Sequence, residues 1–138
     1  MKHMGRHLIL EFWGCKNLDS PEIAEEALTT AALESGATLL NVRTHRFEPH
    51  GVSGIAVIAE SHISIHTWPE LGYAAVDIFT CGEHVNPYQA SEVLKRYFKP
   101  DHNHALEIIR GIDTTGLKEA DQLNSKVGGE TGTSCPGL

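Results

Sequence analysis

Cysteine is scarce in this 138-residue chain. The three cysteines, Cys15, Cys81 and Cys135, are widely separated, and none forms a CxxC pair. An odd number without such a pair argues against a disulfide framework and against a zinc ribbon, because both use cysteines in matched sets. At least one thiol therefore stays free, and we expect all three to be free.

The chain also lacks a long hydrophobic run and a basic stripe. The apolar run near the N-terminus, residues 8–10, stops at Glu11 and is too short for a signal peptide or a membrane span. We therefore expect a cytoplasmic protein that does not contact membranes. The formal net charge is −7. Because no cluster of Lys and Arg reverses this charge locally, nucleic acid is not an expected partner.

The order of apolar and polar segments predicts one domain of the α+β class. Ser20 as N-cap and Pro21 at the first helical position open a predicted helix that ends near residue 35, and a second helix is predicted over residues 87–98. Extended segments are predicted over residues 6–14, 37–48, 52–67, 73–80 and 105–111, and the 52–67 segment is long enough to contain a break. The order β-α-β-β-β-α-β with short connections predicts a two-layer sandwich, a mainly antiparallel sheet with two helices on one face.

The composition changes near Asp113, after which large apolar residues almost disappear. Such a segment cannot bury enough surface to offset the entropy of ordering. We therefore expect a folded domain over residues 1–112 and a flexible C-terminal tail over residues 113–138. A cysteine in that tail, Cys135, is a poor candidate for chemistry.

Residues 60–70, ESHISIHTWPE, carry many polar side chains for a strand in the middle of a small domain. Alternation along a regular strand places the isoleucines on one face and a polar row on the other, namely His62, Ser64, His66 and Trp68. One interpretation is the solvent-facing side of an antiparallel sheet. Another is a noncatalytic metal module with His62, His66, Cys81 and His84 as ligands. The spacing is not a standard zinc pattern, and His62 and His66 would lie roughly 13 Å apart on a straight strand.

A third interpretation is serine chemistry at Glu60-Ser61. A serine hydroxyl can attack the carbonyl of the preceding residue and convert the amide into an ester. Elimination of that ester leaves dehydroalanine, which hydrolyses to a pyruvoyl group and ammonia. Such a keto group condenses with a substrate amine and withdraws electrons while carbon dioxide leaves. The dipeptide alone is common and does not decide between these interpretations.

The longer strings resemble one family closely. They are ESHISIHTWPE at residues 60–70, YAAVDIFTCG at 73–82, GRHL at 5–8, FEPHGVSG at 47–54 and NP at 86–87. Together they resemble the short prokaryotic S-adenosylmethionine decarboxylase proenzymes, over residues 5–112. The resemblance implies cleavage between Glu60 and Ser61 into chains 1–60 and 61–138, the second beginning with a pyruvoyl group. That cofactor would form a Schiff base with S-adenosylmethionine, and loss of carbon dioxide would yield the aminopropyl donor for spermidine synthesis.

The resemblance also implies roles for individual residues in catalysis. Ser53 and His66 match positions that assist self-processing, with His66 as the acid/base that promotes ester breakdown. An imidazole suits this role because it can accept and donate a proton near neutral pH. Cys81 matches the thiol that returns a proton to the substrate α-carbon, although a buried structural cysteine remains the alternative.

Three further positions match residues that hold the nucleoside. The resemblance implies that the rings of Phe47 and Trp68 sandwich adenine and that Glu70 accepts hydrogen bonds from the ribose hydroxyls. The residue types fit, since stacking needs a flat apolar face and a diol needs an acceptor with two oxygens. A core Phe, a core Trp and a solvated turn Glu are the structural alternatives. No metal is expected.

The spacing of Ser61 and His66 raises a difficulty. On one straight strand the two side chains point to opposite faces and lie roughly 16 Å apart. Either the chain bends between Ser61 and Ser64, or the new terminus moves after cleavage, or a second protomer completes the site. The resemblance implies a dimer of cleaved protomers, which favours the last option. A same-fold pyruvoyl-dependent decarboxylase of arginine or ornithine remains the alternative function.

Overall fold

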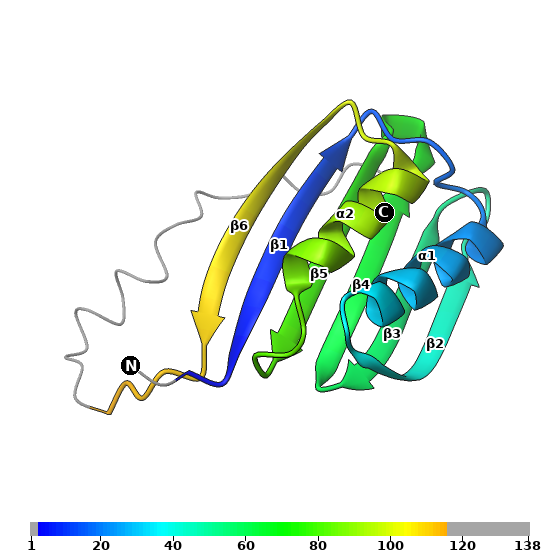
Figure 1. The fold of residues 1–138 in the computed structure, drawn as a ribbon. Helices are drawn as coiled ribbons and strands as arrows, with labels where there is room; N and C mark the ends of the chain where they lie inside the picture. Colours follow the sequence, from blue (N-terminus) through cyan, green and yellow to red (C-terminus); the bar gives the residue numbers. More distant parts are fainter. Residues whose placement is uncertain (1–2, 116–138) are drawn as a thin grey trace.

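A six-stranded antiparallel sheet forms the frame of the protein, and two helices cover one of its faces (Figure 1). The structure, a computed structural model, describes residues 3–115. The strands lie side by side in the order β2-β3-β4-β5-β1-β6. In chain order the elements are β1 (Gly5–Trp13), α1 (Pro21–Glu34), β2 (Thr38–Arg46), β3 (Val52–Ala59), β4 (Ser61–Trp68), the 3-10 turn η1 (Pro69–Leu71), β5 (Tyr73–Cys81), α2 (Pro87–Phe98) and β6 (His102–Arg110).

The predicted fold class is confirmed, with one refinement in the middle of the chain. The 52–67 segment does contain a break, so it forms two strands, β3 and β4. Ile58 pairs with Ser61, which leaves Ala59 and Glu60 as a tight two-residue turn. The last strand begins at His102, three residues earlier than predicted. Most of the predicted tail, residues 116–138 with Cys135, lies outside the described residues.

Local sequence signals fix the helix ends. Ser20 accepts a hydrogen bond from the Ile23 N–H at 3.2 Å and so caps α1, as predicted. Asn86 caps α2 in the same way by accepting from the N–H groups of Tyr88 and Gln89. At the other end of α2, Lys99 adopts a left-handed conformation with φ of 46°. These caps set where the helices begin and end above the sheet.

The core lies between the helices and the inner face of the sheet. Ile63 and Ile65 of β4 are fully buried there, against helix residues such as Leu28 and Leu94. The opposite face, called the outer face below, carries the alternate residues of each strand. Within the described chain no helix covers it, and apolar side chains such as Val57 remain 41% exposed. None of the described helices has the length and apolar character needed to cross a membrane.

Candidate active site

The proposed cleavage position lies at a strand end. Ser61 is the first residue of β4, directly after the two-residue turn, and it pairs with Thr80 of β5. The carbonyl oxygen of Glu60 accepts a hydrogen bond of 2.9 Å from the backbone N–H of Cys81. A donor in this position draws electrons from the carbonyl carbon and would stabilise an oxyanion formed there. The hydroxyl that could attack and the carbonyl it would attack therefore belong to adjacent, ordered residues.

Cys81 ends β5 beside this turn. Its partner on β1 is Gly5, where a Cβ atom would lie 3.0 Å from the Cys81 sulfur and 2.6 Å from the Thr80 carbonyl oxygen. Only glycine leaves room for this close approach of β1 to β5. The Cys81 side chain is partly buried and unpaired. A thiol and the proposed scissile bond are thus brought to the same corner of the sheet.

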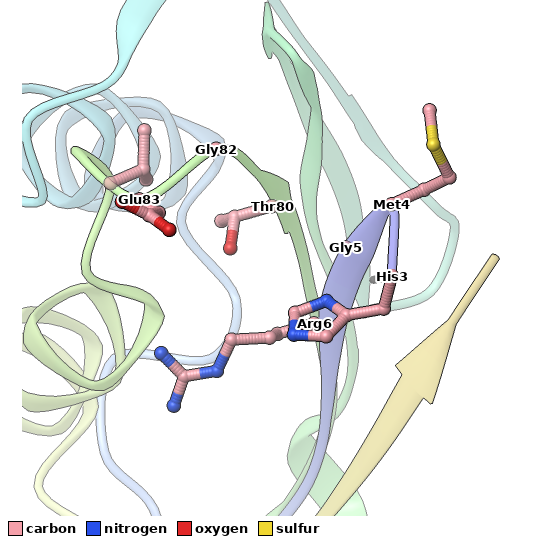
Figure 2. A pocket seen from close by; sticks show the side chains of 8 residues that line it. His3, Met4, Gly5, Arg6, Thr80, Gly82 and Glu83 are labelled. Atoms are coloured by element: carbon pink, nitrogen blue, oxygen red, sulfur yellow. The ribbon is translucent and has the colours of Figure 1, made fainter. Parts of the chain in front are cut away.

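A cavity of about 580 Å³ opens at the same corner. Figure 2 shows the side chains of Arg6, Thr80 and Glu83 around it. Thr80 links the cavity to the cleavage position because it is the cross-strand neighbour of Ser61. The lining carries charges of both signs, and Arg6 also binds Glu107 at 2.6 Å.

Ser53 and His66 form a second cluster on the outer face. They are directly paired across β3 and β4, and Ser53 Oγ lies 2.7 Å from His66 Nδ1. Register alone brings these two residues together, although thirteen positions separate them in the chain. His66 is exposed on this face, where it can reach a bound molecule.

The three predicted nucleoside residues adjoin this pair. Phe47, Trp68 and Glu70 line one cavity of about 460 Å³, whose wall also includes Ser53 and His66. Here the structure brings together five of the predicted site residues, from β3, β4 and the loops that follow β2 and β4. An exposed aromatic ring, a second ring and a carboxylate are the groups that a nucleoside requires.

Neighbouring side chains hold these residues in place. The Trp68 ring stacks on Tyr73 with centroids 5.2 Å apart and an interplanar angle of 26°. Glu70 Oε2 lies 2.8 Å from His50 Nε2. Phe47 meets His45 edge to face at 4.6 Å and is 47% exposed. His50 lies within the FEPHGVSG string, but no pattern in the sequence marks it as a contact of Glu70.

The two clusters lie at opposite ends of β4. Because Ser61–Trp68 is one continuous strand, Ser61 and His66 remain roughly 16 Å apart along it. The proposed bend between Ser61 and Ser64 is therefore wrong. The other two explanations for this distance are still compatible with the structure. Either the new terminus moves after cleavage, or a second protomer completes the site.

The side chains that the metal-module interpretation proposes as ligands do not form a metal site. His62 and His66 lie apart on β4, as expected for a regular strand. Among residues 3–115 no group of three or more His, Cys, Asp or Glu side chains is arranged to hold a metal ion.

One further cluster on the outer face was missed from the sequence. His7 of β1 binds Asp77 of β5 with 3.0 Å between Nε2 and Oδ1. His62 packs edge to face against His7 and Phe79, with centroids 6.3 and 5.9 Å apart. Burial lowers the pKa of His62, and the nearby positive charges of His7 and Arg110 lower it further, against an opposing effect of Asp77. Strand alternation puts His7, Asp77 and His62 on one face, but their adjacency depends on β1 pairing with β5.

Comparison with known proteins decides the family. The family model described as S-adenosylmethionine decarboxylase matches residues 6–111. The chain belongs to this family. As a member of the S-adenosylmethionine decarboxylases it is a carboxy-lyase, and the resemblance seen in the sequence is confirmed.

Individual relatives agree with the family match. The S-adenosylmethionine decarboxylase proenzyme of Methanococcus maripaludis is 54% identical over 114 residues, covering 81% of this chain and 93% of the relative. The proenzyme of the same name from Thermomicrobium roseum is 53% identical over 113 residues, covering 81% and 97%. The crystal structure of the adenosylmethionine decarboxylase from Aquifex aeolicus is similar with a TM-score of 0.77 and 32% identity, covering 86% of this chain and 100% of that one. All three of these relatives are named as decarboxylases of S-adenosylmethionine, and none is named for arginine or ornithine.

Proposed function

We propose that the chain cuts itself between Glu60 and Ser61 and then decarboxylates S-adenosylmethionine with the pyruvoyl group made from Ser61. The observation that carries the proposal is the corner where the Ser61 hydroxyl, the Glu60 carbonyl and Cys81 meet, with the Cys81 N–H 2.9 Å from the Glu60 oxygen. Family membership supplies the reaction, and this corner supplies the groups that the reaction needs.

Self-cleavage uses groups already in place. As Ser61 Oγ adds to the Glu60 carbonyl carbon, negative charge develops on the carbonyl oxygen, and the Cys81 N–H is aimed at it. The strand pairing of β4 with β3 and β5 holds Ser61 on one side of this bond. Later breakdown of the ester needs an acid/base, for which we propose His66 with Ser53 as its hydrogen-bond partner at 2.7 Å.

Decarboxylation follows once the cofactor exists. At position 61 Ser61 would provide the pyruvoyl carbonyl, whose chemistry when formed would be to bind the substrate amine and withdraw electrons during loss of carbon dioxide. The Cys81 side chain lies at the end of β5 beside this position and can return a proton to the α-carbon. The cavity near Thr80 offers room for the amino-acid end of the substrate, with Arg6 and Glu83 on its wall.

The nucleoside end of the substrate needs a separate binding site, at the cavity beside Ser53 and His66. We propose that Phe47 and Trp68 stack on adenine and that Glu70 binds the ribose hydroxyls, since the three line one cavity with His66. In one protomer this cavity lies at the far end of β4 from Ser61, too far for one substrate to span both. A two-fold dimer of cleaved protomers removes the difficulty, because it can place the Ser61 end of one chain beside the His66 end of its partner. The partly apolar outer face, where Ile55 and Val57 are exposed, is a surface on which such a dimer could form.

Intact mass under denaturing conditions is the first test of the proposed function. We expect two masses, chains 1–60 and 61–138, the second lacking a free N-terminal amine, together with release of carbon dioxide from S-adenosylmethionine and not from arginine or ornithine. Ser61→Ala is the matched control and should remain one inactive chain. A folded wild-type protein that keeps its full-length mass after long incubation would refute the proposal.

Mixing two inactive variants tests the dimer. Ser61→Ala lacks the pyruvoyl precursor, and a preparation of His66→Ala lacks the processing acid/base. If each site combines both protomers, co-expression should yield one functional site per mixed dimer and restore cleavage of the His66→Ala chain. Absence of cleavage in mixed dimers isolated by two different tags would contradict the dimer proposal. The cytoplasmic location remains a prediction, which cell fractionation can check.

A further inference from the structure

The first step of the proposed cleavage needs a base near Ser61 Oγ, and the sequence assigns no residue to that step. His66, expected to promote the later ester breakdown, lies within one protomer roughly 16 Å from Ser61 on the same strand. Among the residues that the structure describes in one chain, His62 is the titratable side chain placed within hydrogen-bonding reach of Ser61 Oγ, with its Nδ1 3.4 Å away. Apo sites often hold such pairs at long distances that shorten as the reaction begins.

We propose that His62 is the general base that removes the Ser61 hydroxyl proton in the first step of self-cleavage. This inference rests on the proposed function and adds a residue to it. His62 Nδ1 takes the proton from Ser61 Oγ as Oγ bonds to the Glu60 carbonyl carbon. The bond from that carbon to the Ser61 nitrogen then breaks, and the nitrogen receives the proton from His62. The products are an ester on Ser61 Oγ and a free amine, so no other reactant is needed.

The surroundings of His62 suit a base and its orientation. The His62 ring is wedged edge to face between Phe79 and His7, and His7 is itself fixed by its 3.0 Å bond to Asp77. His7 and Asp77 do not touch Ser61 and therefore act as positioning residues. A ring held on two sides cannot easily turn its Nδ1 away from the hydroxyl.

The protonation state of His62 also suits the role. Burial lowers the pKa of His62, so its ring is neutral at neutral pH and its nitrogen can accept a proton. The charged groups around the ring act in both directions. The positive charges of His7 and Arg110 lower this pKa and the carboxylate of Asp77 raises it. Arg110 reaches the cluster by stacking on Phe79, 4.6 Å from the ring centroid.

His62 is proposed to act in ester formation and His66 in ester breakdown, and this difference gives a chemical test. Hydroxylamine cleaves esters but not ordinary amides. In freshly purified His66→Ala, where the ester forms but breaks down slowly, hydroxylamine should cut the chain at residue 60. In His62→Ala the amide should persist, hydroxylamine should leave the chain intact, and spontaneous cleavage should slow by roughly 10²- to 10⁴-fold. Added imidazole should partly restore cleavage, because a diffusible base replaces the missing ring.

A second test leaves His62 in place. The cleavage rate should be constant at neutral pH and above, and it should fall as the pH drops below the lowered pKa of His62. Removing the negative charge in Asp77→Asn should move this fall to lower pH, and removing the positive charge in Arg110→Gln should move it to higher pH. A purely structural role for the cluster would not shift the profile in opposite directions. If His62→Ala fails to fold by circular dichroism, His62→Gln takes its place in the hydroxylamine test.

Failure of this inference can be told from failure of the proposed function. A wild-type chain that never cleaves would overturn both. A wild-type chain that cleaves, together with a folded His62→Ala or His62→Gln that cleaves at the same rate, would overturn the role of His62 alone. Ester in the His62 variant at the level seen in His66→Ala would do the same, and so would identical pH profiles in the two charge variants.

Discussion

Gly5→Ala should damage both the stability and the self-cleavage of the protein. An added Cβ would meet the Thr80 carbonyl oxygen at 2.6 Å, Phe79 Cε2 at 2.8 Å and the Cys81 sulfur at 3.0 Å. The nearest of these atoms belongs to the backbone of β5 and cannot swing aside. Strands β1 and β5 must therefore separate at the residue whose N–H binds the Glu60 carbonyl.

The expected change in the free energy of unfolding of Gly5→Ala follows from two opposing effects. Overpacking of this kind costs about 1–3 kcal/mol. Replacing glycine by alanine restricts the unfolded chain and returns about 0.4–1 kcal/mol. We expect a net loss of about 1–2 kcal/mol in the free energy of unfolding. Gly54→Ala is the matched control, because Gly54 is also a buried strand glycine but its added Cβ would first meet the movable end of the Leu28 side chain at 2.8 Å.

Denaturant unfolding at one fixed protein concentration measures the free energies of unfolding of Gly5→Ala and Gly54→Ala. Both variants are made in the Ser61→Ala background so that each remains a single chain. The rate of self-cleavage is then measured with Ser61 restored. Loss of one oxyanion donor costs roughly 10²–10³ in rate, and a displaced donor costs less, so we expect about ten-fold slower cleavage in Gly5→Ala. Equal stability of the two variants, with Gly5→Ala cleaving at the wild-type rate, would refute the reasoning.

Three other outcomes are expected from the structure. Thr67→Val should lower the free energy of unfolding by about 1–3 kcal/mol in denaturant titrations, because the buried hydroxyl accepts from the Val52 N–H at 2.8 Å and donates to the Leu18 carbonyl at 2.7 Å. A loss below that of the exposed control Thr38→Val would contradict it. Glu70→Gln should raise KM for S-adenosylmethionine while leaving the extent of chain cleavage unchanged, since Glu70 lines the nucleoside cavity and not the cleavage corner; a chain that stays uncut would argue against this separation. Burial and the nearby Asp101 raise the pKa of Cys15 to about 11. Its thiol should therefore stay neutral at pH 8 and react slowly with iodoacetamide. Peptide mass spectrometry measures this reaction, and the unfolded chain, which should react fast, is the control.

The fold was accessible from the sequence because its signals are local. Ser20 and Pro21 mark a helix start by their own hydrogen-bonding and backbone preferences, and the structure uses them in that way. The break at Glu60 was left open because a two-residue turn without glycine has a weak signature. The early start of β6 at His102 depends on pairing with Trp13, 89 positions away in the chain, which no local pattern reports.

The site was accessible only in part. Its residues followed from a family resemblance, and the pairing of Ser53 with His66 could have been found from hairpin register once the turn at residues 59 and 60 was known. The contact of the Cys81 N–H with the Glu60 carbonyl could not have been predicted from the sequence. It depends on β5 lying beside β4 and on the register of that pairing. The same holds for His7 and Asp77, which meet only because β1 inserts between β5 and β6.

The placement of β4 explains how one segment can serve two chemical steps. Its first residues belong to the cleavage corner, where the chain must be intact and the carbonyl held, while its last residues belong to the nucleoside cavity. Because a strand is stiff and its side chains alternate, the two ends keep a fixed separation and a fixed face. The proposed cleavage after Glu60 would open a turn and leave β4 paired on both sides by β3 and β5. The new terminus would therefore lie at the end of a strand that both neighbours still hold, so the proposed nucleoside cavity would not have to be rebuilt when the cofactor forms.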